Sequence, residues 1–126
     1  MFDNLDPASP TPLYAQLAER LRAAIAAGDL APGELLPSVR QLAGRLRLNP
    51  GTVVQAYRDL ERSGLVELRQ GSGTFVRELS APRRREEQAA VSDRLAAEML
   101  ARAAGLGLSG QDLLAALRNA LGDKRP

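Results

Sequence analysis

The fold is decided by residues 36–76, which read LPSVRQLAGRLRLNPGTVVQAYRDLERSGLVELRQGSGTFV. Near the start of this stretch, Ser38 can accept the backbone N–H of Gln41 while the side chain of Gln41 reaches back to Ser38. Such a capping box is typical of the beginning of a helix, and it predicts a helix over residues 38–46. The buried face of that helix is expected to consist of the apolar residues at helical spacing, namely Val39, Leu42, Ala43 and Leu46.

A second helix is predicted immediately downstream, over residues 50–62. Asn49 can cap its first backbone N–H groups, and Pro50 suits the first turn because that position needs no N–H. Only residues 47–49 separate this helix from the preceding one, which is the spacing of a helix-turn-helix. In that motif the second helix enters the major groove of DNA with its N-terminal end leading.

Two short strands are predicted after the second helix, over residues 66–69 and 74–77. The segment between them, residues 70–73, contains two glycines that permit positive φ and is expected to form a hairpin tip. Upstream, the pattern predicts a helix over residues 12–27 and a short strand over residues 34–36. The expected fold is therefore mainly α with a small β-hairpin, in the order of a winged helix-turn-helix.

The remainder of the chain is predicted to be a linker over residues 80–85 followed by helices over 86–104 and 110–121. Both helices carry apolar stripes, but two helices cannot enclose a core of their own. We therefore expect them to pack against their counterparts in a second copy, with packing against their own winged helix as the alternative. The predicted organisation is a DNA-binding domain over residues 1–78 and a two-helix dimerisation segment over 79–126. The residues assigned to the dimer interface are Val91, Leu95, Met99, Leu113, Leu117 and Leu121.

The composition argues against several classes of protein. The chain has no cysteine and no histidine, which excludes a disulfide framework, a Cys/His zinc site and catalysis by a Ser-His or Cys-His pair. It also has no phosphate-binding loop and no acidic pair in an evident apolar pocket, so we expect neither an enzyme nor a bound cofactor or metal. With no apolar run of about 18 residues and no signal-peptide pattern at the N-terminus, we expect a cytoplasmic protein without a membrane partner.

Positive charge is concentrated in the stretch that contains the predicted motif. Residues 38–77 carry seven arginines and three acidic residues, a net charge of +4, whereas the formal charge of the whole chain is +2. A basic block of this kind is typical of a protein that meets a polyanion with one face, although an ordinary solvated surface would also show it.

Polar side chains at the start of the second motif helix suit the recognition of base edges. Thr52 offers a hydroxyl and a methyl group, and Gln55 can pair with adenine. Glycines in the hairpin tip let the backbone approach DNA closely, and the polar groups around them can touch phosphate or the minor groove, although such a tip is often only a turn. The candidate contacts are Asn49, Gly51, Thr52 and Gln55 in the helix, with Arg69, Gln70, Gly71, Ser72 and Thr74 in the hairpin.

Short motifs follow one another along the chain, namely PLY at 12–14, LPSVRQLA at 36–43, NPGTV at 49–53, AY at 56–57, LE at 60–61, GL at 64–65 and GSGTFV at 71–76. In this order they resemble the DNA-binding domain of the GntR family of bacterial transcription regulators, over about residues 12–77. The resemblance implies a winged helix-turn-helix that binds palindromic operator DNA as a homodimer, with repression by promoter occlusion as the family expectation. The short tail resembles that of the YtrA-like branch of the family, which ends in two helices.

The resemblance also implies individual contacts with DNA. The base-reading arginine of the family, at the start of the first motif helix, falls on Arg40, for which a solvated surface arginine is the alternative. Many relatives have arginine where this chain has Pro50, so one base-reading donor is missing and Arg40 is expected to carry more of the readout. Ser38 is expected to divide its hydroxyl between capping and a phosphate. The contacts of the family in the recognition helix and the wing tip fall on Asn49, Gly51, Thr52 and Gly71.

Two further expectations concern regulation and a rival function. A small-molecule effector or a stress that shifts the packing of the helix at 86–104 would change the separation of two recognition helices and release DNA. The rival interpretation is a winged helix used as a protein-interaction module without specific DNA binding. The basic block over residues 38–77 and the polar start of the helix at 50–62 argue against the rival.

Overall fold

The computed structural model describes residue 2 and residues 5–122 of the 126-residue chain. It contains five helices and one hairpin within these residues, and they divide into two compact units, residues 1–88 and 89–126. The first unit, called the head below, contains all elements up to the first two turns of helix α4. The two units are described separately.

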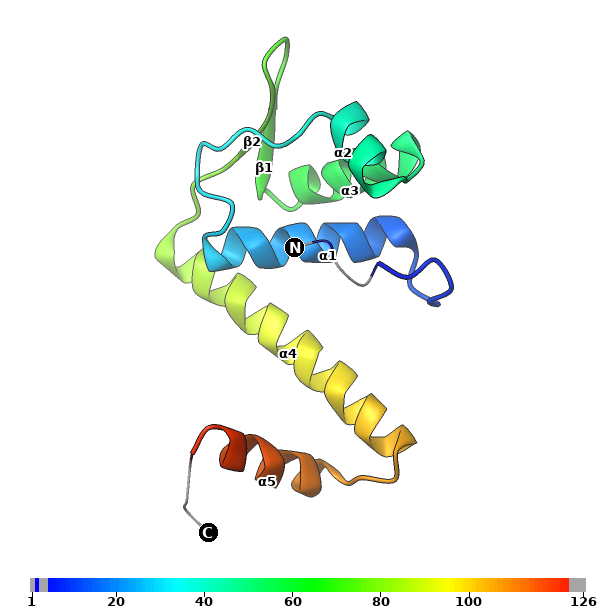
Figure 1. Ribbon diagram of the computed structural model, residues 1–126. Helices are drawn as coiled ribbons and strands as arrows, with labels where there is room; N and C mark the ends of the chain where they lie inside the picture. Colours follow the sequence, from blue (N-terminus) through cyan, green and yellow to red (C-terminus); the bar gives the residue numbers. More distant parts are fainter. Residues whose placement is uncertain (1, 3–4, 123–126) are drawn as a thin grey trace. The chain divides into compact units, whose positions relative to one another are not determined.

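The head has the element order predicted from the sequence (Figure 1). Helix α1 is followed by the short helix α2, the longer helix α3 and the antiparallel strands β1 and β2. This order of a helix-turn-helix followed by a hairpin confirms the predicted winged helix-turn-helix. The bounds are α1 Leu13–Ala27, α2 Val39–Leu46, α3 Pro50–Arg62, β1 Val66–Arg69 and β2 Gly73–Val76.

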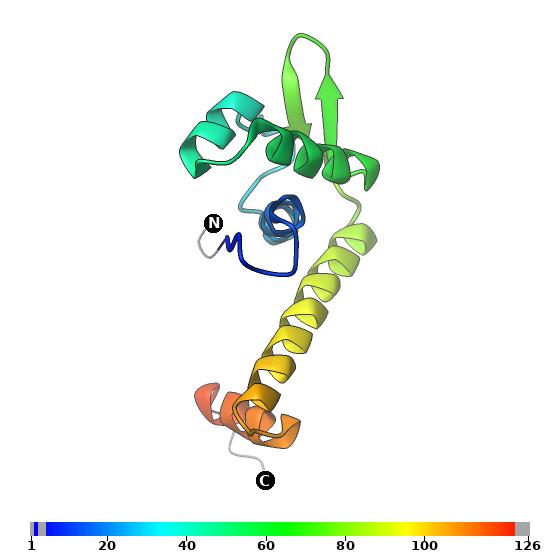
Figure 2. The ribbon, with the colours of Figure 1, turned by 90° about the vertical axis from the view of Figure 1, so that its right-hand side faces the viewer.

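The core of the head lies between α1 and the helix-turn-helix. Figure 2 looks along α1 and shows α3 crossing over it, with the hairpin rising beyond. Helices α1 and α3 share the most extensive contact between elements of the head, and α2 packs against α3. The largest side chains with almost no exposure are Leu17, Leu21 and Ile25 of α1, Leu42 of α2, Val53 and Leu60 of α3, and Leu65 and Val66 beside and within β1.

Local capping explains where α2 and α3 begin. The hydroxyl of Ser38 accepts the N–H of Gln41 at 3.1 Å, and the side-chain oxygen of Gln41 accepts the N–H of Ser38 at 3.0 Å. The Asn49 side chain accepts the N–H of Gly51 at 2.7 Å, directly before the proline that opens α3. Both caps confirm the expectations from the sequence, because each depends on residues within three positions of one another.

A third stretch of chain bonds to the hairpin where a short strand was predicted over residues 34–36, but it forms an isolated bridge and not a strand. The N–H of Leu36 donates to the carbonyl of Thr74 at 2.8 Å, and the N–H of Val76 donates to the carbonyl of Glu34 at 2.9 Å. A single bridge pairs Leu35 with Phe75. These bonds fix the base of the hairpin to the segment that leads into α2.

The predicted linker over residues 80–85 is wrong. Helix α4 runs from Ala81 to Gly105, so it includes almost all of that segment. The hydroxyl of Ser80 accepts the N–H of Arg83 at 3.2 Å, and Pro82 lies in the first turn, where a missing N–H costs nothing. Two of the three arginines in this segment, Arg83 and Arg84, are bonded to the rest of the head, whereas Arg85 is exposed.

The second unit consists of the remainder of α4 and helix α5, Gly110–Ala120. Ser109 caps α5 through the N–H of Asp112 at 3.1 Å, and the hydrogen bonds from Ser109 lower the pKa of the Asp112 carboxyl. Among the described residues of this unit only Ala103 is buried. No helix in the described part of the chain has the length and apolar character needed to cross a bilayer.

Candidate nucleic-acid interface

One side of α3 is buried and the other carries the polar residues singled out from the sequence. Val53, Ala56 and Leu60 have no exposed surface and pack into the core. On the opposite side, Asn49, Gly51 and Gln55 are exposed and Thr52 is half-buried. The structure therefore brings the four helix candidates together on the free side of α3, where base edges could reach them.

Two arginines missed by the sequence reasoning continue this polar ridge. Arg58 and Arg62 are both exposed and lie three and seven positions beyond Gln55, which places them on the same side of the helix. The Nε of Arg62 donates to the carbonyl of Arg58 at 3.4 Å, and within the described residues neither guanidinium forms an ion pair. The helical spacing from Gln55 was the signal that could have found them.

The turn between α2 and α3 contains a further exposed arginine in an unusual conformation. Arg47 has φ 55° and ψ 45°, the left-handed region, and its N–H donates to the carbonyl of Ala43. This conformation costs a residue with a side chain about 1–2 kcal/mol relative to the right-handed one. The turn keeps a positive charge three residues before the start of α3, where glycine would relieve the strain.

The start of α2 presents the two residues that the family resemblance placed on DNA. Arg40 is exposed and has no ion pair with any described residue. The Ser38 hydroxyl accepts the Gln41 N–H, so its own proton is available to a phosphate oxygen. A hollow lined by Ser38, Gln41, Ser72 and Thr74 separates this helix start from the hairpin.

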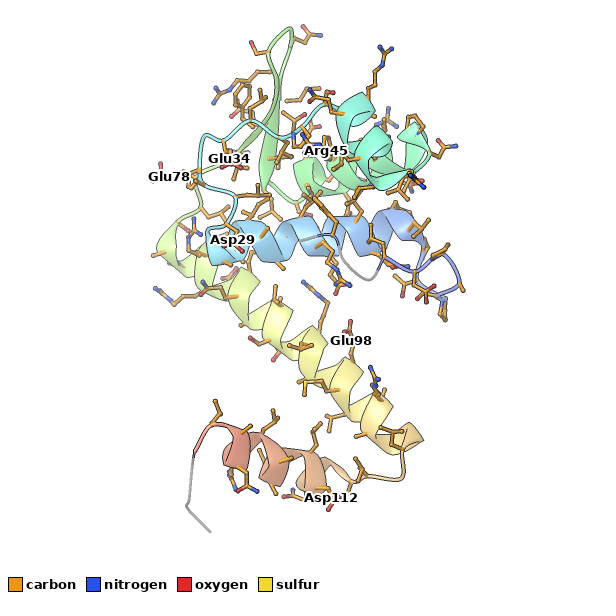
Figure 3. The ribbon with its side chains drawn as sticks, in the orientation of Figure 1. Asp29, Glu34, Arg45, Glu78, Glu98 and Asp112 are labelled. Carbon is orange, nitrogen blue, oxygen red and sulfur yellow. The ribbon has the colours of Figure 1, made fainter. Side chains whose placement is uncertain are left out.

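Tyr57 braces α3 against the segment that precedes α2. Its hydroxyl donates to the carbonyl of Pro37 at 2.7 Å, and the residue is 7% exposed. Burial raises the pKa of Tyr57 to about 12, with the nearby Arg45 opposing the shift in part. Figure 3 labels Arg45 on the α2 side of the head. This hydrogen bond links α3 to the segment that leads into α2, so it holds the two helices that carry the candidate contacts together.

The raised pKa of Tyr57 predicts a specific alkaline loss of stability. In the unfolded chain a tyrosine ionises near pH 10, whereas Tyr57 in the head stays neutral to about pH 12. Between pH 9 and 11 the unfolded state therefore gains stability relative to the folded state, by about 1.4 kcal/mol. Urea unfolding at both pH values should show this extra loss in the wild type and not in Tyr57→Phe. An equal loss in the two proteins would contradict it.

The wing holds its candidate residues around a partly neutralised arginine. The guanidinium of Arg69 lies 4.4 Å from the centre of the Phe75 ring and 3.8 Å from the carboxylate of Glu67. Gly71 has φ 77°, as the tight tip requires, and Gln70 and Ser72 are exposed. Gly73 has φ 121°, which disfavours any residue with a side chain, and an added Cβ would lie 2.7 Å from the end of the Leu35 side chain, which would have to move.

Three acidic residues of the head lie away from this surface, whereas Glu61 of α3 is exposed and lines the same hollow as Gln55 and Arg58. Figure 3 labels Asp29, Glu34 and Glu78 at the end of the head where α1 ends, on the other side of the hairpin from α2 and α3. The exposed arginines named above belong to α2, to α3, to the turn between them and to the wing, where Arg69 lies beside Glu67. The free side of α3 is therefore mainly basic, with Glu61 as an acidic residue among its arginines.

Comparison with known proteins identifies the family of this head. Residues 13–76 match the profile described as bacterial regulatory proteins, gntR family. The chain belongs to the GntR family. This membership confirms the resemblance seen in the sequence, and it places the protein among transcriptional regulators rather than enzymes.

Individual GntR proteins resemble the chain in sequence or structure. The transcriptional repressor YtrA of Bacillus subtilis is 43% identical over 74 residues, which are 59% of this chain and 57% of that repressor. A GntR family regulator from Listeria monocytogenes superposes with a TM-score of 0.71 at 25% identity, over 90% of this chain and 97% of that one. A structure of AraR(DBD) in complex with operator ORR3 superposes with a TM-score of 0.51 at 32% identity. The match covers 57% of this chain and 87% of that one. The chain thus spans little more than half the length of the curated relatives it matches.

Proposed function

We propose that this protein is a sequence-specific, double-stranded DNA-binding repressor that acts as a homodimer on a palindromic operator. The observation that carries the proposal is the free side of α3, where Asn49, Gly51 and Gln55 are exposed in line with unpaired arginines, between the start of α2 and the wing. A protein in the same family is known with an operator bound to the equivalent kind of domain. The repressor role follows YtrA.

The chemistry of each side chain determines which part of the DNA we propose that it contacts. The start of α3 enters the major groove, where Thr52 and Gln55 reach base edges and the free N–H groups of the helix favour phosphate. Arg40 reads a guanine through two parallel hydrogen bonds. The arginines of α3 and the turn hold the backbone on either side. The wing contributes Gln70, Gly71, Ser72 and Thr74 to the adjacent backbone or minor groove.

Dimerisation is proposed because the second unit exposes more apolar surface than a solitary pair of helices tolerates. Leu95 is 54% exposed, Leu117 41% and Leu121 83%, while Val91, Met99 and Leu113 are half-buried. A fully exposed large side chain gains roughly 1.5–3 kcal/mol on burial, so burying the surface that these six still expose against a second copy is worth about 5 kcal/mol. Contiguous apolar surface of this kind marks an interaction site. Two heads on one dimer then match the two halves of a palindrome.

The role proposed for Arg69 is a phosphate contact, which makes a definite prediction for salt dependence. Arg69→Ala should weaken binding to all duplex sequences alike and reduce the slope of log K against log salt by about one. Fluorescence anisotropy titrations from 50 to 200 mM salt would measure the slope. Because Glu67 already neutralises part of this charge, the double variant Glu67→Gln/Arg69→Ala separates the two contributions. A slope unchanged by Arg69→Ala would remove this residue from the contacts.

The experiment that tests the proposed function is selection of bound fragments from a random duplex pool by the full chain. A sequence-specific dimer yields an enriched inverted repeat, with half-site centres separated by about one duplex turn or a multiple of it. A pool that stays random, with no retention on DNA-cellulose at low salt, would overturn the proposal in favour of a protein-interaction module. Adding candidate metabolites to the selected complex tests whether an effector releases it.

A further inference from the structure

The first two turns of α4 are fastened to the C-terminal end of α1. The Nη1 of Arg84 donates to the carbonyl of Ile25 at 3.1 Å, and the side-chain amide of Gln88 donates to the carbonyl of Ala26 at 3.0 Å. These carbonyls lie in the last turn of α1, where backbone oxygens have no partner within the helix. The start of α4 therefore completes the end of α1 rather than leaving the head as a free tether.

A second attachment is ionic and centres on Glu87, whose side chain is 11% exposed. One carboxylate oxygen, Oε1, accepts from Arg83 Nη2 at 3.0 Å and from Arg83 Nε at 3.2 Å. The other, Oε2, lies 3.8 Å from Nη1 of Arg22 on α1. Burying a carboxylate costs free energy unless it is paired and hydrogen-bonded, and here two arginines pair with it.

The same two arginines are bonded to the C-terminal end of the recognition helix α3. Arg22 Nη2 lies 3.5 Å from the carboxylate of Asp59 and donates to the hydroxyl of Ser63. Arg83 Nη2 donates to the backbone carbonyl of Ser63 at 2.7 Å. We call Arg22, Asp59, Ser63, Arg83 and Glu87 the Arg22 cluster. Its two positive and two negative charges balance, and they join α1, α3 and α4 at one point.

We propose that Glu87 is a positioning residue that locks the start of α4 to the recognition helix and so sets the half-site spacing that a dimer accepts. This inference rests on the proposed function, because it concerns how two heads share one operator. It adds a definite role for a buried charge that touches no part of the DNA-binding surface. None of the motif residues used to recognise the family includes Glu87.

The physical reason is the stiffness of the connection. Helix α4 is continuous from Ala81 to Gly105, so the turns held by the Arg22 cluster and the residues that lead into the second unit belong to one helix. Each base pair added between half-sites moves one of them by about 3.4 Å and turns it by about 35°. A rigid connection tolerates little of this displacement, whereas a flexible one accepts several spacings with similar affinity.

The test compares Glu87→Gln with the matched control Glu86→Gln in the full-length chain. Both variants remove one negative charge from neighbouring positions of α4, but Glu86 is exposed and has no ion pair within the described residues. Affinity is measured for the selected palindrome, for versions with one or two base pairs added or removed at the centre, and for an isolated half-site. Wild type and Glu86→Gln should prefer one spacing by about tenfold, and Glu87→Gln by only about twofold.

A readout without DNA keeps the inference falsifiable. Amide hydrogen exchange of residues 81–88 should accelerate about tenfold in Glu87→Gln, with α3 and the wing unchanged, because local opening of the first turns is no longer opposed by the Arg22 cluster. If circular dichroism shows that Glu87→Gln has lost the fold of the head, Gln88→Ala carries both measurements, since it removes the bond to Ala26 without changing a charge.

The outcomes separate this inference from the proposed function. A wild-type chain without preference for any palindrome overturns the proposed function itself. A wild type that prefers one spacing, combined with a Glu87→Gln variant that keeps both the same preference and the same exchange of residues 81–88, overturns only the role of Glu87. Half-site affinity equal within about twofold in all folded variants supports positioning, and a large loss there contradicts it.

Discussion

Replacing Leu117 by aspartate is expected to convert the protein into a monomer with roughly 10² to 10⁴ times lower affinity for its palindrome. Leu117 lies on α5, is 41% exposed, and shares one side of that helix with Leu113 and Leu121. A carboxylate there would be taken from water into an apolar interface without a partner. In a dimer, binding of one head holds the second head close to the other half-site and so raises the overall affinity. A monomer would lose this increase in affinity.

The matched control for this prediction is Ala115→Asp. Ala115 is exposed on α5 and lies about 160° around the helix from Leu117, so the same charge enters the same helix on the opposite side. Sedimentation equilibrium should show dimers for the wild type and Ala115→Asp and monomers for Leu117→Asp, while half-site affinity stays equal. Dimers of Leu117→Asp with full operator affinity would show that α5 is not the dimer interface.

The second large effect is expected from Arg40→Ala, which should cost about 2 kcal/mol of specific binding and relax the preference at one base pair. Arg40 is exposed at the start of α2, free of ion pairs within the described residues, and the segment before it is held by the Tyr57 hydroxyl. Its guanidinium is therefore available for two parallel bonds to guanine. Because Pro50 provides no donor in the recognition helix, no neighbouring arginine at that position can compensate.

The control for Arg40 is Arg85→Ala, which removes the same charge from an exposed position on α4. Competition binding against operators mutated at each base pair in turn should show one position whose discrimination vanishes in Arg40→Ala and persists in Arg85→Ala. A uniform loss across all positions would make Arg40 a phosphate contact instead. Unchanged affinity and preference would exclude it from the interface.

The sequence predicted the parts of the fold that depend on neighbouring residues. Ser38 with Gln41 and Asn49 with Pro50 set the starts of α2 and α3 through bonds that span no more than three residues. Two short strand-forming stretches separated by a glycine-rich tip predicted the hairpin in the same way. The predicted bounds of β2 differ from the observed ones by one residue. Signals of this kind lie within a single turn and need no knowledge of the tertiary structure.

The start of α4 could not be predicted because its partners are distant in the chain. Arg84 bonds a carbonyl 59 positions away, and Arg83 bonds one 20 positions away. Taken alone, a proline followed by three arginines is typical of a solvated linker. Only the folded head shows that Arg83 and Arg84 bond to backbone carbonyls at the ends of α3 and α1.

Only the part of the candidate site that lies at a helix start was predicted from the sequence. Asn49, Gly51 and Gln55 were selected as polar residues at a helix start, and they lie exposed on α3. Arg58 and Arg62 were not predicted, because the polar residues that indicate a DNA contact were sought only in the first turns of the helix. The left-handed conformation of Arg47 had no local signal, since arginine is not among the residues that favour it.

In the proposed complex two copies of this chain, joined through their last two helices, hold two heads on one symmetric duplex. Sedimentation velocity of the chain at micromolar concentration, alone and with a palindrome selected from random DNA, tests it most directly. We expect a stable dimer in both cases and a complex of two chains for each duplex. A monomer that remains a monomer alone and binds the duplex as a single chain would contradict it.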